Sequence, residues 1–214
     1  ISSDYDYRND VKSFDELRHF INVTEIEDSA FERCRNLTSV MLPEGLESIG
    51  NNAFLQCTSL TGITIPESVT RIDGTAFQYC SSLTEMILPE GITEIAFGAF
   101  YNCSSLSEIV LPESVTKLGD YAISQCKSLK SIVLPENLTE IGDYAFNNCY
   151  YLTSVTLPKN LTTIGKGAFH SCMSLTGIRI PDSVTSIGPE AFLNCESLRN
   201  ITIPGGVNEI ADGL

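Results

Sequence analysis

The chain has 214 residues, of which 43% are hydrophobic, and 27 acidic against 13 basic side chains give a formal net charge of −14. This charge argues against nucleic acid and anionic membrane surfaces as partners, because both select basic patches. No apolar run approaches the length of a membrane span, and the first residues lack the basic and apolar regions of a signal peptide, so we expect no direct membrane insertion and interpret the chain, which starts without Met, as a mature or excised segment.

Residues 1–20 do not follow the pattern of the rest of the chain, and we interpret them as an N-terminal cap. Ser13 and Glu16 have capping-box spacing, which predicts an amphipathic helix over about 13–20. Its apolar positions are Phe14, Leu17 and Ile21. The alternative is a degenerate first strand, because Val11, Phe14 and Leu17 fall in the Cys, Leu and Val columns of the repeat. Either structure would cover the apolar end of the first coil.

Residues 21–214 repeat one unit, first complete from Cys34 to Gln56, without insertion or deletion. The cysteines that mark the unit are Cys34, Cys57, Cys80, Cys103, Cys126, Cys149, Cys172 and Cys195. The prolines are Pro43, Pro66, Pro89, Pro112, Pro135, Pro158, Pro181 and Pro204. A fixed period of this length is typical of a solenoid, in which each unit buries its apolar face against its neighbours. We therefore predict one elongated domain of about eight coils.

Each unit contains the signals for two short strands and a return. Residues 38–43 (T-S-V-M-L-P) alternate, which places Val40 inward and Met41 outward on a strand that successive copies should pair into a parallel sheet. Proline ends this strand, and a second extended piece follows, as at 69–72. A column of small residues comes next, and size rather than positive φ is its expected requirement, because Ala96 occupies it. The stretch 51–57 (N-N-A-F-L-Q-C) should form a short helix or 3₁₀ turn.

The consensus C-x-x-L-x-x-[VIM]-x-[LI]-P resembles a leucine-rich repeat. The Pro after the strand, the I-G pair and the A-F-x-x-C ending resemble the BspA-like repeats of bacterial cell-surface proteins, over residues from about 20 to 214. The resemblance implies a β-rich α/β fold, a right-handed leucine-rich-repeat solenoid with a parallel sheet on one face and short helical or 3₁₀ turns. The column that usually holds Asn is occupied by Gly, Ser or Asn, so an internal asparagine ladder is not expected.

All eight cysteines occupy one column. Equivalent residues of successive coils lie about 4.8 Å apart, within the Cα range of a disulfide, yet their side chains point the same way into the core. We expect a ladder of reduced, buried thiols that act as small hydrophobic groups, and a bridged pair is the alternative. The absence of a C-x-x-C pattern argues against zinc.

The sequence offers no catalytic or cofactor motif. His19 and His170 lie far apart and lack a nucleophile pattern, so we expect no enzyme activity, no cofactor and no metal site. A column of carboxylates follows the prolines, namely Glu44, Glu67, Glu90, Glu113, Glu136 and Asp182. Solvated turn residues are the simpler interpretation of this column, and a surface for a cation or a basic partner is the alternative.

The outward strand column is where the repeats differ most. It reads Met41, Thr64, Ile87, Val110, Val133, Thr156, Arg179 and Thr202. Outward positions on a soluble sheet are normally polar, so the three consecutive apolar rungs are a candidate binding patch. The candidate ligand-binding residues are Met41, Ile87, Val110, Val133, Glu85, Glu108 and Arg179. The alternative is that β-branched residues are there because they favour strands. Phe97, at a position that is polar or Gly in other repeats, is either local repacking or part of an exposed contact surface.

These features predict a non-enzymatic protein-binding scaffold. The family resemblance implies an extracellular or cell-surface adhesin that binds host matrix or cell-surface proteins. The alternative is a structural spacer, which would show uniform polar columns rather than a distinctive patch. The last coil, with Leu198, Ile201 and Ile210, has nothing drawn to cover it, so self-association through this end is a further expectation.

Overall fold

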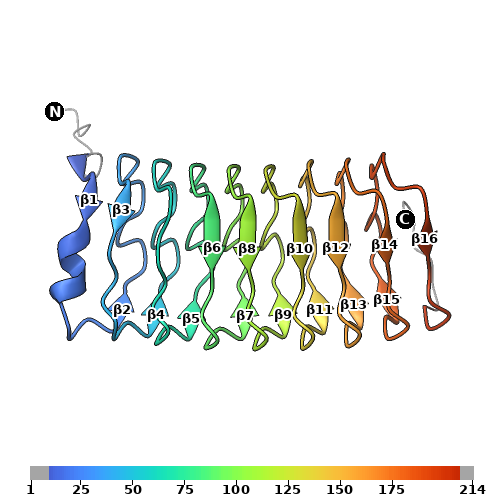
Figure 1. Cartoon of the computed structure of the whole chain (residues 1–214), viewed down its shortest axis with the longest axis horizontal. Helices are drawn as coiled ribbons and strands as arrows, with labels where there is room; N and C mark the ends of the chain where they lie inside the picture. The colour runs from blue at the N-terminus through green and yellow to red at the C-terminus, as the bar shows by residue number, and fades with distance from the viewer. Residues whose placement is uncertain (1–9, 208–214) are drawn as a thin grey trace.

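The computed structural model describes residues 10–207. The chain forms an elongated solenoid whose coils follow one another along the long axis (Figure 1). Within the described residues the only helix is η2, a 3₁₀ turn over Asp15–His19. The predicted repeat solenoid is confirmed: every strand pair is parallel, and equivalent residues of neighbouring repeats lie opposite each other, as Glu85 and Glu108 do.

Two rows of short strands run along the solenoid (Figure 1). The main strands are β3 (Ser39–Val40), β6 (Glu85–Ile87), β8 (Glu108–Val110), β10 (Ser131–Val133), β12 (Ser154–Thr156), β14 (Ile178–Arg179) and β16 (Ile201–Thr202). The second strands are β2 (Glu25–Ile26), β4 (Ser48–Ile49), β5 (Arg71–Ile72), β7 (Glu94–Ile95), β9 (Lys117–Leu118), β11 (Glu140–Ile141), β13 (Thr163–Ile164) and β15 (Ser186–Ile187). A turn after each proline joins the two rows, closed for example by the Leu46 N–H donating to the Pro43 carbonyl at 3.0 Å.

The main strands do not form the continuous sheet that the sequence predicts. They pair two by two, as β6–β8, β10–β12 and β14–β16, whereas five successive second strands, β7 to β15, form one sheet. In the coil between those of β3 and β6, residues 62–64 form no strand. This coil carries Gly62 at the first outward position, and glycine weakens strand formation because it contributes no side chain to pair with its neighbours.

The return from the second strand to the next main strand is a series of turns, and the predicted short helix is wrong. Each of these return segments, such as 50–57, holds two left-handed residues four positions apart, for example Asn52 at φ 56° and Gln56 at φ 60°. A left-handed residue ends any helix, since its carbonyl turns away from the axis. The N–H groups of Asn52, Phe54 and Gln56 instead donate to carbonyls of the following coil.

Size rather than positive φ explains the glycines of the column at the start of the return segment, although Asp73 and Ala96 occupy this column in two coils. Its glycines do not have positive φ, but a Cβ on Gly165 would lie 2.6 Å from the Gly142 carbonyl carbon and 2.7 Å from the Asp143 nitrogen. Each coil therefore stacks directly on the backbone of the coil before it.

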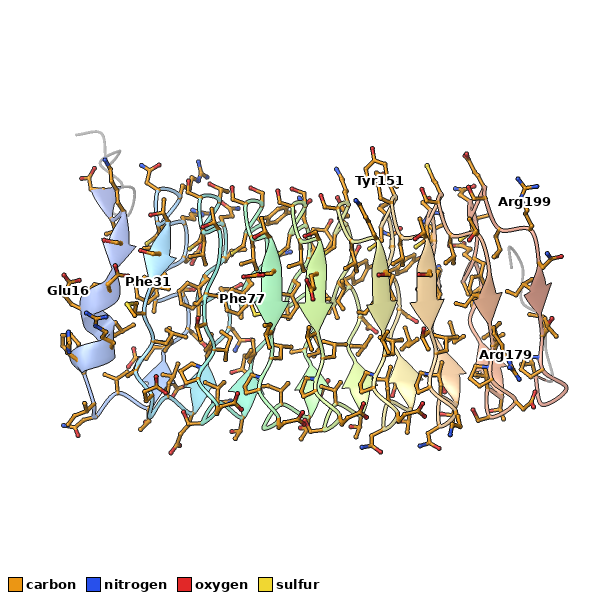
Figure 2. The ribbon with its side chains drawn as sticks, viewed as in Figure 1. Glu16, Phe31, Phe77, Tyr151, Arg179 and Arg199 are labelled. Carbon is orange, nitrogen blue, oxygen red and sulfur yellow. The ribbon has the colours of Figure 1, made fainter. Side chains whose placement is uncertain are left out.

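The core is a stack of identical layers. Phe31, Phe54, Phe77 and Phe100 stack with ring centroids 5.1 to 5.6 Å apart and ring planes within 3° of parallel. Ile123 interrupts the stack and is fully buried, so it fills the place of a ring with local repacking. Figure 2 shows the labelled Phe31 and Phe77 at mid-height in the ribbon, two coils apart.

The cysteine column lies in the core as predicted: all eight thiols are free and buried. The sequence did not reveal their hydrogen bonds. Each thiol from Cys57 onwards donates to a carbonyl of the preceding coil, as Cys103 does to Phe77 at 3.1 Å. Burial raises the pKa of these thiols, to about 12 for Cys57 and Cys149 and about 11 for Cys195.

The N-terminal segment combines parts of both predicted alternatives. β1 (Ser13–Phe14) pairs with β3, but Phe14 lies opposite Val40, where exact repetition would place Leu17, so the register of the degenerate strand is wrong. The helix is a 3₁₀ turn without a side-chain cap, because Ser13 belongs to the strand and the capping box does not form. Leu17 is buried over the first coil. The division into a cap of 1–20 and a solenoid of 21–214 stays a prediction.

At the other end, Leu198, Ile201, Ile203 and Val207 are half-buried and pack against the core. Ile210 lies outside the described residues. Self-association through the last coil therefore stays a prediction.

Candidate ligand-binding surface

The main-strand side of the solenoid displays the column that the sequence singled out. Every residue of this column is exposed, and the inward neighbours Met86, Ile109 and Ile132 are buried. The assignment of the column to the solvent side is thus confirmed. The exposed fractions of the three apolar rungs are 65% for Ile87, 43% for Val110 and 72% for Val133.

Strand pairing arranges these residues into a stripe. Ile87 lies directly opposite Val110 across β6 and β8, and Val133 lies opposite Thr156 across β10 and β12. Glu85 and Glu108 form the neighbouring rung of the same pair, and both are exposed. The structure therefore brings the middle three apolar residues and the two glutamates together, with two like charges in register. Met41 and Arg179 lie on opposite sides of the stripe, each two coils away from it.

Shallow hollows lie along the same side, at places where neighbouring main strands are not paired. One is formed between β8 and β10, and Glu108, Val110, Val133 and Lys130 line it. A second, between residues 62–64 and β6, is lined by Glu85 and Ile87. Met41 lines a third with Thr64, and Arg179 lines a fourth with Thr156 and Asp182. Each of the seven candidate residues therefore borders a hollow.

The two lysines of these hollows, Lys130 and Lys159, were not among the candidate binding residues. Lys130 lies between β8 and β10 beside the exposed glutamate Glu108, and Lys159 borders the hollow of Arg179. The signal was available, because Lys159 is the one basic residue in the carboxylate column that follows the prolines. The surface consequently offers apolar groups together with both signs of charge.

The carboxylate column itself contributes to the backbone. Glu113 accepts the Glu136 N–H at 2.9 Å, and Glu136 accepts the Lys159 N–H at 3.4 Å, each from the next coil. These exposed carboxylates therefore cap turns, which fits the simpler of the two interpretations. Within the described part of the chain, no group of three or more His, Cys, Asp or Glu side chains is placed to hold a metal ion. None of the helices in residues 10–207 is long and apolar enough to cross a bilayer.

Known proteins place the chain among bacterial repeat proteins. The BspA type leucine rich repeat region family matches residues 3–130 and 119–214, with six copies of the repeat. The leucine-rich repeat protein of T. pallidum is 31% identical with a TM-score of 0.57, over 83% of this chain and 72% of that one. A leucine-rich repeat protein from Eubacterium ventriosum is 27% identical with a TM-score of 0.58, over 89% of this chain and 60% of that one.

A leucine rich cell surface protein from Faecalibacterium prausnitzii is 24% identical over 88% of this chain and 81% of that one, with a TM-score of 0.47. None of the curated proteins matches the chain significantly. The family match covers nearly the whole sequence, and its repeat is the one that the described coils display. The chain belongs to the BspA-type leucine-rich-repeat family.

Proposed function

We propose that the chain is a non-enzymatic protein-binding module of a cell-surface or secreted protein, and that its ligand, a host matrix or cell-surface protein, binds the outward column of the main strands. Repeat solenoids of this type present long surfaces to protein partners. The observation that carries the proposal is the exposed apolar stripe of Ile87, Val110 and Val133 beside two hollows.

The exposed apolar stripe lowers the solubility of the free protein and contributes nothing to its core. Ile87 and Val133 are two of the most exposed large hydrophobic residues in the described chain. Equivalent positions in other coils are threonines, Thr64 and Thr156, which have the same β-branched shape and are also exposed. Strand preference alone is satisfied by threonine, so it does not account for the change to apolar side chains. Contiguous apolar surface of this kind marks interaction sites.

The spacer alternative predicts uniform polar columns. The outward column instead changes from apolar in the middle coils to Thr and Arg179 further along, and the hollows differ in their charged residues. This variation along a regular backbone favours a binding surface, because a spacer gains nothing from it.

Ile87→Asp together with Val133→Asp tests the surface. We expect the double variant to bind immobilised extracellular-matrix proteins at least tenfold more weakly, or about 1.4 kcal/mol, because two charges replace the apolar contacts. Its free energy of unfolding should change by no more than about 0.5 kcal/mol, since both side chains are exposed. Binding is measured at two salt concentrations and unfolding by denaturant titration.

The matched control is Ile87→Thr together with Val133→Thr, which installs the residues found in other coils and keeps the strand preference. We expect an intermediate loss of binding from it. Unchanged binding by a folded Asp variant would place the ligand elsewhere, and no binding by the native chain would contradict a matrix ligand.

A further inference from the structure

The return segments carry a cluster of aromatic side chains that the strand surface does not involve. Tyr121 lies at its centre: its ring is 5.8 Å from Phe97, 6.3 Å from Tyr101 and 5.2 Å from Tyr144, measured between centroids. Tyr79 extends it by an edge contact with Tyr101 at 5.5 Å. The cluster thus spans four successive coils.

Part of this cluster is open to solvent. Phe97 is 56% exposed, and the four tyrosines are half-buried. Most equivalent positions in other coils hold small or polar residues, such as Asn51 for Phe97, Gln78 for Tyr101 and Asn52 for Tyr121. The fold therefore does not require rings here, and Tyr121 even occupies a left-handed position, at φ 57°, that disfavours a bulky side chain.

Two carboxylates lie beside the rings. Asp120 and Asp143 are exposed on the same turns, and each accepts the backbone N–H of the equivalent residue in the next coil, at 2.8 and 2.7 Å. These bonds hold both carboxylates in place beside the cluster. Burial raises the pKa of Tyr121 most, the charges of Tyr144, Asp120 and Asp143 raise it further, and Lys166 lowers it, so both aspartates are near enough to act on this ring. A cation is favoured beside these two carboxylates.

One end of the cluster already holds a cation. The Lys166 ammonium lies 5.7 Å from the centroid of the Tyr144 ring, within the range of a cation–π contact. The other such contact in residues 10–207 joins Lys127 to Tyr150, on a different turn. No basic side chain of the described residues lies in cation–π contact with Phe97, Tyr101 or Tyr121, and Phe97 is the most exposed of these three rings.

We propose that Phe97, Tyr101 and Tyr121, with the carboxylates of Asp120 and Asp143, bind a lysine- or arginine-bearing segment of a partner protein. The cationic group would lie over the rings as Lys166 lies over Tyr144, and the two carboxylates would balance its charge. The formal net charge of −14 on the chain attracts such a segment from a distance. This interface is separate from the main-strand surface and does not depend on it.

The test uses a fluorescent peptide of alternating lysine and glycine, titrated with the whole chain and followed by fluorescence anisotropy. The variant is Phe97→Asn, Tyr101→Gln and Tyr121→Asn combined, which installs residues that other coils hold at the same positions and leaves every carboxylate in place. We expect at least a tenfold loss of peptide affinity, with an unchanged thermal unfolding transition.

Two controls separate the rings from other causes. Tyr151→Ser removes an aromatic residue that is 62% exposed at the edge of the solenoid, and Ile87→Thr changes the main-strand surface; both should bind the peptide as the native chain does (Figure 2). A peptide with acetylated lysines should bind at least tenfold more weakly, whereas trimethylated lysines, which keep the charge, should preserve affinity.

Three results would overturn the proposal. If the triple variant binds the lysine peptide as tightly as the native chain, net charge alone attracts the peptide. If the acetylated peptide binds equally well, the cluster is an apolar surface without preference for cations. If neutral oligosaccharides bind the native chain in a ring-dependent way and the lysine peptide does not, the rings recognise sugars. The Ile87→Asp and Val133→Asp variant tests the main-strand surface alone. Whether it loses its ligand therefore has no bearing on the proposal for the aromatic cluster.

Discussion

The return side and the main-strand side of each coil solve the same problem, stacking on a neighbour, in different ways. On the return side the hydrogen bonds to the next coil recur at the same positions in repeat after repeat. The left-handed residues, the small-residue column, the stacked Phe rings and the thiols recur in the same way. On the main-strand side the strands pair only two by two, and the outward column changes from Met41 to Arg179. The return side therefore fixes the coil, and the outward side chains of the main-strand side are free to vary.

The largest effect we expect is loss of stability at alkaline pH, because the return side buries a whole column of thiols. Their pKa lies above the unfolded value near 9.0, at about 12 for Cys57 and Cys149. Their contribution is complete below pH 9 and is lost as pH rises toward 12, since the unfolded chain releases protons first. At pH 10 the loss is about 1.4 kcal/mol for each thiol whose pKa is raised, and several such thiols contribute.

Denaturant midpoints measured in reductant between pH 7 and pH 10 check this expectation. Thiol titration in denaturant without reductant should first find close to eight free thiols; a count near zero would show bridged pairs. The variant Cys103→Ala should lose less stability between the two pH values than the native chain. A midpoint that does not fall by pH 10 would contradict the buried thiol column.

Truncating the ring stack should have the next largest effect. Phe77 is fully buried between Phe54 and Phe100, so Phe77→Ala should cost about 3 to 5 kcal/mol by loss of packing and by the cavity left behind. The control is Phe77→Ile, because Ile123 occupies the same column in another coil. Urea unfolding should rank Ile well above Ala; equal costs would mean that the coil of Phe77, unlike that of Ile123, requires a ring.

A pair of glycine variants compares the two sides directly. Gly165→Ala should cost about 1 to 3 kcal/mol, because its Cβ would meet the backbone of the preceding coil. Gly177→Ala, on the main-strand side, meets nothing within 4 Å and should be neutral or stabilising by about 0.4 to 1 kcal/mol through the unfolded chain. Thermal unfolding of both variants measures the difference, and a destabilising Gly177→Ala would show that the main-strand side is as constrained as the return side.

The smallest difference between two compared variants concerns the thiol hydrogen bond. If a buried hydroxyl lacked a partner, Cys103→Ser would cost more than Cys103→Ala. In the structure the Phe77 carbonyl lies 3.1 Å from the thiol and also accepts the Cys80 N–H. A serine hydroxyl at position 103 would thus have an acceptor. With alanine there, the Phe77 carbonyl still accepts the Cys80 N–H, so both variants should cost about 1 to 2 kcal/mol. Denaturant unfolding that finds serine worse by more than this range would show that the shorter hydroxyl does not reach the carbonyl.

The sequence predicted the candidate strand surface because alternation in T-S-V-M-L-P leaves little freedom: Val40 inward requires Met41 outward. It predicted the aromatic cluster less well. Phe97 was visible as an irregularity, but Phe97, Tyr101 and Tyr121 occupy three different turn positions, and only the folded return segment brings their rings together. Tyr121 and Tyr144, which share one column in successive repeats, were the available signal.

The repeat period determined by itself the solenoid, the inward columns, the buried thiols and the size of the small column, because each follows from one unit stacking on an identical one. Three features were decided only by the tertiary structure: the turns of the return segment, the pairing of main strands in twos, and the register of β1 against β3. Each depends on which backbone group of the neighbouring coil a given N–H meets. These hydrogen bonds join different coils, so the pattern of residues within one repeat does not predict their partners.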